Sequence, residues 1–152
     1  MSSTAPPAHQ PPGRRELPQI KAAATPPFRL PAEHFGAALG WLLVVAALLP
    51  GVAPLLASGR ALEPPVFSLV HAAVLGVVGS AIFGALYQFV PGGLGVPLRS
   101  IRLGHLGFWL YQTGTVVLVA GFWWWRGWLQ LVGWALIFGA VGAVSLNILP
   151  AR

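Results

Sequence analysis

Four long stretches without Asp, Glu, Lys or Arg constrain the fold of this chain more than any other sequence feature. They cover residues 35–59, 66–90, 103–125 and 127–151. Each is long enough to cross about 30 Å of hydrocarbon at about 1.5 Å per helical residue. Short connections between them imply antiparallel neighbours. Residues 33–152 are therefore predicted to form an all-α membrane domain, a four-transmembrane-helix up-down bundle.

Composition supports a bilayer as the solvent for this chain. Charged residues make up 8% of the 152 positions and hydrophobic residues 56%, whereas a soluble domain carries about 25% charged residues. The first predicted span is the least regular, because Pro50 and Pro54 should kink it or end its helix early.

Residues 1–32 have a different character, being basic and rich in proline. They contain few large apolar side chains, so they cannot bury enough surface to offset the entropy of ordering. We predict a disordered tail. It is either simply solvated or an arm that docks onto a partner subunit.

The Lys and Arg residues predict an orientation. Seven lie in the tail, in the loop before residue 103 or at the carboxyl end, and only Arg60 and Arg126 lie on the other side. We expect a bacterial plasma membrane, and the positive-inside rule then places both termini on its cytoplasmic side.

Four tryptophans are expected to anchor the helices at the outer interface of the membrane: Trp123, Trp124, Trp125 and Trp128. The cations follow no stripe, so nucleic-acid binding is not expected.

Several kinds of chemistry lack the residues they need. The chain has no cysteine, which excludes thiolate metal sites and iron–sulfur clusters. The spans contain no ionisable carboxylate, Lys or Arg, groups that proton-coupled carriers usually need. No nucleophile–base pair or phosphate-binding loop is present. We expect no catalytic residue and no enzyme activity from this chain alone.

Small residues form two regular stripes. One repeats every four residues along the second span, and the other repeats every seven along the third: Ala72, Gly76, Ser80 and Gly84, then Gly107, Gly114 and Gly121. Such stripes let helix backbones approach closely. They favour helix packing, although a flat porphyrin could also lie against such a surface.

One histidine stands apart from the others. His71 is the sixth residue of the second predicted span, about 8 Å inside it at 1.5 Å per residue. A neutral imidazole at this depth needs a partner. That partner is either a hydrogen bond to a neighbouring helix or, with His71 as axial ligand, a haem iron. His34 and His105 lie near the opposite interface, where they could form a separate site.

Residues 67–121 resemble part of the large subunit of cbb-type haem–copper oxidases and related NnrS-like membrane proteins. The resemblance covers about a third of the chain. It rests on His71, Leu75-Gly76, Phe83-Gly84-Ala85-Leu86-Tyr87, Pro91, Arg99-Ser100, Arg102-Leu103, Phe108-Trp109-Leu110 and Gly114.

The resemblance implies a haem site that is largely missing here. In those oxidases the helix carries two histidines, one for the high-spin haem and one for the low-spin haem. Only the second has a counterpart, His71, since Leu69 occupies the place of the first. Gly107 occupies the place of a further histidine, and no histidine cluster could hold copper. The resemblance therefore argues against oxygen or nitric oxide reduction by this chain alone.

Three functions follow from these observations. The first is a small subunit of a larger respiratory or other electron-transfer membrane complex. The second is a b-type haem-binding membrane protein that uses His71, with the second ligand absent, supplied by another subunit or donated by a second copy. The third, with less support, is a small transporter or channel.

Overall fold

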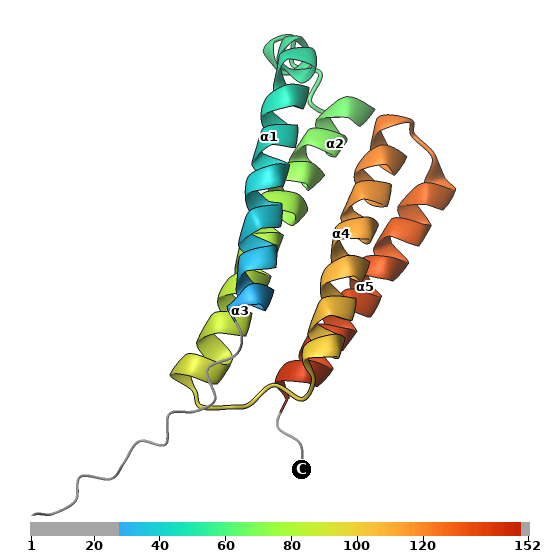
Figure 1. The fold of residues 1–152 in the computed structure, drawn as a ribbon. Helices are drawn as coiled ribbons and strands as arrows, with labels where there is room; N and C mark the ends of the chain where they lie inside the picture. Colours follow the sequence, from blue (N-terminus) through green and yellow to red (C-terminus); the bar gives the residue numbers. More distant parts are fainter. Residues whose placement is uncertain (1–27, 150–152) are drawn as a thin grey trace, which may run out of the picture.

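The computed structural model describes residues 28–149, which form four long helical segments and, within that range, no strand (Figure 1). The elements are α1 (Arg29–Ala57), α2 (Pro64–His71), η1 (Ala72–Gly79), α3 (Ser80–Gly93), α4 (Ile101–Trp123) and α5 (Gly127–Ile148). α2, η1 and α3 form one continuous rod, so four rods are long and apolar enough to cross a membrane. The predicted all-α, four-span fold is confirmed.

The helix boundaries differ from prediction mainly at the first span. α1 begins at Arg29, so residues 29–32, which were expected in the tail, are helical. An ion pair between Arg29 and Glu33, 2.8 Å long, joins the first two turns, and Pro31 fits the first turn because no helical N–H is needed there. The second span extends through Pro91 to Gly93. The remaining tail positions, residues 1–27, lie outside the described residues, as do residues 150–152.

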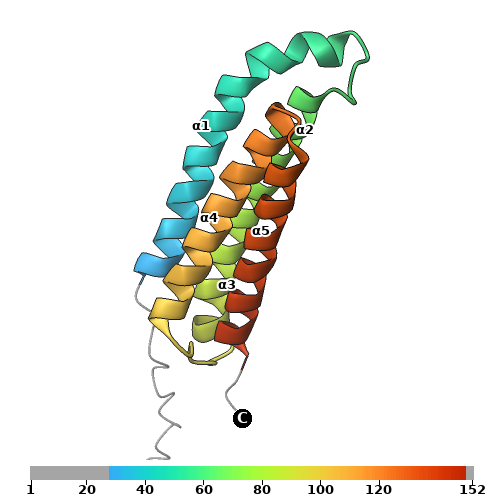
Figure 2. The same ribbon diagram turned by 90° about the vertical axis from the view of Figure 1, so that its right-hand side faces the viewer.

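α1 bends near its end instead of stopping. Pro50 and Pro54 both lie inside the helix, and its last turns run across the end of the bundle (Figure 2). Each proline removes one helical hydrogen bond and forces the backbone to tilt. The bend carries Val52, which is fully buried, onto Val66 and Leu69 of α2.

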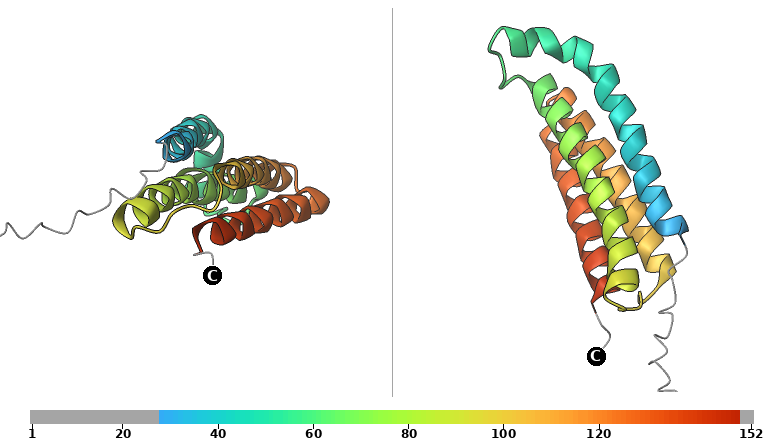
Figure 3. Two further views of the ribbon diagram at one scale, coloured as in Figure 1. Left: turned by 60° about the horizontal axis from the view of Figure 1, so that its bottom comes forward. Right: turned by 90° about the vertical axis from the view of Figure 1, so that its left-hand side faces the viewer.

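The helices pack as two pairs joined through α4. α1 lies along the α2–η1–α3 rod, and α4 and α5 form a hairpin (Figure 3). α4 also contacts α2. The Ser100 end holds the start of α1 and the loop before α4, and the Arg126 end holds the loops after α1 and α4 (Figure 1).

A π-helical segment, η1, occupies the middle of the second rod. Its wider turns coincide with a side chain from α4: the Tyr111 hydroxyl donates to the Leu75 carbonyl oxygen at 2.8 Å. That hydroxyl lies where a Cβ on Gly79 would be. The glycine therefore makes room for an interhelical hydrogen bond to the backbone, the kind of irregularity that often marks a functional or tightly packed position.

Candidate functional site

His71 lies at the junction of α2 and η1, near the Arg126 end. Its Nδ1–H donates to the Phe67 carbonyl oxygen at 2.7 Å. The ring stacks on Phe122 of α4 at 4.3 Å between centroids and meets the edge of Trp134 of α5 at 6.1 Å. Because Nδ1 bonds to the backbone, Nε2 carries the free lone pair. This is the arrangement that orients a histidine for a metal or for a hydrogen-bond donor.

His71 is far from the histidines of the Ser100 end. His34 packs against Gly84, which is 13 residues after His71 along a continuous rod, or about 20 Å at 1.5 Å per residue. Two axial ligands of one iron must have nitrogens about 4 Å apart, twice a metal–imidazole bond. His34 therefore cannot share an iron with His71, and no cluster of three His, Cys, Asp or Glu side chains that could hold a metal occurs between residues 28 and 149.

The small-residue stripe of the second rod faces α1. A Cβ on Gly76 would overlap the indole ring of Trp41, and one on Gly84 would lie 3.1 Å from His34 Cβ. Ala72 and Ser80 are fully buried. Side chains of α1 fill this surface, so it offers no open cradle for a porphyrin.

The stripe of α4 faces α5 along the whole hairpin. A Cβ would lie 3.3 Å from Val144 if added at Gly107, 2.9 Å from Ile137 if added at Gly114, and 2.9 Å from the Gln130 backbone nitrogen if added at Gly121. On α5, a Cβ added at Gly133 would lie 2.7 Å from Leu118 Cβ of α4. This surface too is filled by a helix.

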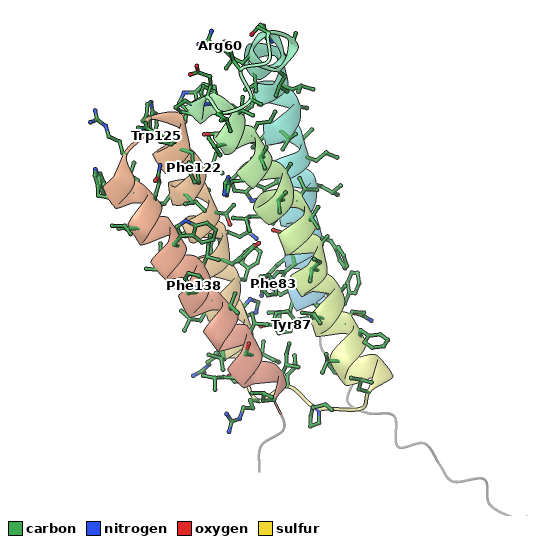
Figure 4. The ribbon with its side chains drawn as sticks, turned by 180° about the vertical axis from the view of Figure 1, so that it is seen from behind. Arg60, Phe83, Tyr87, Phe122, Trp125 and Phe138 are labelled. Atoms are coloured by element: carbon green, nitrogen blue, oxygen red, sulfur yellow. The ribbon has the colours of Figure 1, made fainter. Side chains whose placement is uncertain are left out.

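The four tryptophans of the predicted interface gather at the Arg126 end. Trp123, Trp124, Trp125 and Trp128 are all exposed and lie in or beside the turn between α4 and α5. Trp125 marks this turn in Figure 4. The turn itself uses Trp125 in a left-handed conformation, with φ of 49°.

A hydrogen-bonded chain links three rods near the middle of the bundle. Trp41 Nε1 of α1 donates to Gln112 Oε1 of α4 at 2.8 Å. The amide nitrogen of Gln112 donates to the Ser80 hydroxyl of α3 at 2.9 Å. Trp41, Gln112 and Ser80 are thus each hydrogen-bonded to another rod, as expected for groups that hold membrane helices together.

A second polar group lies at the Ser100 end. The Nδ1 of His105 is 2.8 Å from Glu33 Oε2. His34 is fully buried, and its Nδ1–H donates to the Leu30 carbonyl oxygen at 2.9 Å. His34 and His105 therefore bond to different partners in this structure.

The outward face of α1 carries small residues that the sequence interpretation passed over. Gly36, Gly40, Ala47 and Gly51 are exposed, and a Cβ at any of the three glycines would have no described neighbour within 4 Å. The Gly-x-x-x-Gly spacing of residues 36 and 40 was the available signal.

Comparison with protein-family models, with curated proteins and with solved structures finds no match for this chain.

Proposed function

We propose that this multi-pass membrane protein is a subunit of a larger membrane complex, and that α1 supplies the surface on which a transmembrane helix of another polypeptide docks. The observation that carries the proposal is the exposed small-residue face of α1, defined by Gly36, Gly40, Ala47 and Gly51. The resemblance to oxidase subunits is consistent with a place in an electron-transfer assembly, with both termini in the cytoplasm.

α1 is the least packed of the four spans. Only 11% of the residues in its most apolar stretch are buried, against 33–39% in the other three. It contacts the α2–η1–α3 rod and, less extensively, α4, and leaves its outward face uncovered. A peripheral helix of this kind has room for a neighbour along most of its length.

The small-residue face suits a helix better than lipid. Gly and Ala offer little side-chain surface to an acyl chain, but they let a second helix backbone approach closely enough for extensive van der Waals contact. The same face borders a groove of about 400 Å³ between α1 and α4, lined by Ala37, Gly40, Trp41, Val44, Gln112 and Val116. A helix lying on Gly40 would place its side chains in this groove.

Two adjacent alanines allow a matched test. Successive residues of a helix point about 100° apart, so Ala47 belongs to the small-residue face and Ala46, which is also exposed, points away from it. We expect Ala47→Leu and Gly40→Leu to release the protein from its complex during native electrophoresis of mildly solubilised membranes. Ala46→Leu should migrate with the complex, as the unchanged protein does.

Two results would contradict the subunit proposal. One is migration of the unchanged protein as a monomer under conditions that preserve known complexes of the same membrane. The other is equal migration of the Ala46→Leu and Ala47→Leu variants. Helical content measured by circular dichroism controls for misfolding.

A second candidate function is haem binding through His71, and one observation favours it: the Nδ1–H bond to Phe67 leaves Nε2 free. Both small-residue stripes are covered by helices, so this chain by itself gives a porphyrin no cradle, and a haem would have to lie between His71 and another polypeptide. An absorption spectrum of the intact complex tests this. A Soret band that disappears in His71→Ala supports it, and a spectrum without a Soret band after haem-supplemented expression rejects it.

A further inference from the structure

Four buried polar atoms lack a hydrogen bond among the described residues, and all of them belong to the Ser100 end. One of the four, Glu33 Oε2, lies 2.8 Å from His105 Nδ1 in an ion pair, which leaves three without any partner. They are His34 Nε2, Tyr87 Oη and Asn147 Nδ2. Their side chains come from α1, α3 and α5, and all three residues have no exposed surface. Native proteins leave few buried polar atoms unpaired, and such atoms often bond to an ordered water.

The three side chains lie close together. The rings of His34 and Tyr87 are 5.3 Å apart between centroids. The Asn147 amide faces the Tyr87 hydroxyl without reaching hydrogen-bond geometry. Tyr87 points from α3 towards the α4–α5 hairpin (Figure 4), where Leu30 and Val144 surround it.

The hydrogen bonds that His34 and Asn147 already make determine whether their unpaired atoms are donors or acceptors. His34 Nδ1 donates to the Leu30 carbonyl oxygen, so Nε2 is an acceptor. Asn147 Oδ1 accepts from the Ser100 backbone N–H at 2.9 Å, which turns the amide nitrogen, a donor only, towards the cluster. The Tyr87 hydroxyl both donates and accepts. The cluster therefore offers one acceptor, one donor and one group of both kinds.

A ligand for this cluster must donate to an imidazole nitrogen and accept from an amide. An anion without a proton cannot donate to His34 Nε2, and a metal cation cannot accept from the Asn147 amide. A small neutral molecule with both capacities fits, and water is the simplest. We infer that His34, Tyr87 and Asn147 form an internal water-binding site that ties α1 to α3 and α5.

A largely apolar groove lies between α3 and α5 at the same end of the molecule. It occupies about 510 Å³ and is lined by Phe83, Leu86, Val141, Val144, Ser145, Ile148 and Leu149. These residues flank Tyr87 and Asn147 in the sequence, so the cluster is adjacent to the groove. On another side, the Glu33–His105 pair lies one residue along α1 from His34. The inferred water would therefore lie between a lipid-facing groove and an ionisable pair.

Water-edited solid-state NMR of the full-length protein in liposomes tests the site directly. The labels are ¹⁵N on histidine and ¹³C at Tyr Cζ and Thr Cβ. We expect magnetisation from water protons to reach His34 Nε2 and Tyr87 Cζ at short mixing times. Thr115 is the internal control, because its hydroxyl is equally buried but already bonded to the Tyr111 carbonyl oxygen at 2.9 Å, and it should receive little water magnetisation.

Two variants that each lose one buried hydroxyl make the test specific. Tyr87→Phe should lose most of the water signal at His34 Nε2, whereas Thr115→Val should leave it unchanged. Water transfer to His34 no greater than that to Thr115 in the unchanged protein would overturn the inference, even if Tyr87→Phe fails to fold. A direct contact between His34 Nε2 and Tyr87, or between Nε2 and a group in residues 1–27, would overturn it too.

Discussion

The absence of a side chain at Gly76 allows Trp41 to pack directly against the second rod. The indole of Trp41 lies against the α2–η1–α3 rod where a side chain at position 76 would be. In that position its Nε1 reaches Gln112. The glycine thus permits both a close helix contact and a hydrogen bond to a third rod.

Replacing Gly76 by alanine should therefore destabilise the fold. The added methyl group would push Trp41 away from Gln112, and overpacking of this kind costs about 1–3 kcal/mol. Gly142→Ala is the matched control, since a Cβ there would have no described neighbour within 4 Å. Unfolding in mixed micelles, followed by circular dichroism, gives both free energies. Equal losses in the two variants would show that position 76 does not require glycine.

The sequence indicated where some residues lie along their helices but not which side chains surround them. It predicted the positions of Gly76 and Gly84 in a stripe, because a period of four is visible without a structure, but not their neighbours on α1. It singled out His71 and assigned His34 to the membrane interface. α1 begins at Arg29, and His34 is fully buried among Phe83, Tyr87 and Phe108. Those aromatic neighbours come from two other helices, which a linear pattern cannot place.

At the scale of an element, the bend of α1 is the main departure from a straight rod. A helix of 29 residues would be about 44 Å long at 1.5 Å per residue, well beyond the hydrocarbon thickness of about 30 Å. The bend at Pro50 and Pro54 turns the excess length across the Arg126 end (Figure 2). The two prolines predicted a distortion, whereas its direction depends on the contact of Val52 with α2.

Removing both prolines should straighten α1. Spin labels at Leu39→Cys and Leu56→Cys report on the bend, because both positions are exposed and the chain has no other cysteine. The distance between the labels should increase in Pro50→Ala/Pro54→Ala, since the restored N–H groups complete the helical ladder. Pro97→Ala, in the loop before α4, should leave the distance unchanged. A distance that does not respond to the double substitution would assign the bend to packing alone.

η1 illustrates an element that the sequence did not predict. Nothing in the run Ala72–Gly79 distinguishes a π-helical from an α-helical segment. The wider turns coincide with the Tyr111 hydroxyl bonded to Leu75, a contact that exists only after α4 has packed against the rod.

For the molecule as a whole, the number of spans was predictable and their packing was not. Four uninterrupted apolar stretches are enough to count the spans. Each span is apolar on nearly every side, because one side contacts lipid and the other contacts neighbouring helices. The periodicity of apolar residues therefore could not indicate that α1 is peripheral or that α4 joins the two pairs.

Orientation is the whole-molecule property most open to a direct test. Arg29, Arg99 and Arg102 lie at the Ser100 end, and Arg60 and Arg126 at the other. We expect Leu62→Cys, at the Arg126 end, to react with a membrane-impermeant maleimide on spheroplasts. Leu94→Cys, at the Ser100 end, should react only after permeabilisation. Both positions are well exposed, and the opposite pattern of labelling would reverse the orientation given by the positive-inside rule.

The bond between Trp41 and Gln112 also bears on how the protein is made. The two residues are 71 positions apart, so a nascent chain exposes the indole of its first span to lipid long before the third span leaves the ribosome. α1 and the α2–η1–α3 rod can associate through Gly76 and Gly84 in the meantime, but the indole N–H finds its acceptor only when α4 inserts beside them. Insertion of α4 would thus be the event that converts a provisional helical pair into the finished bundle, and a chain truncated before residue 112 would be a natural target for membrane quality control.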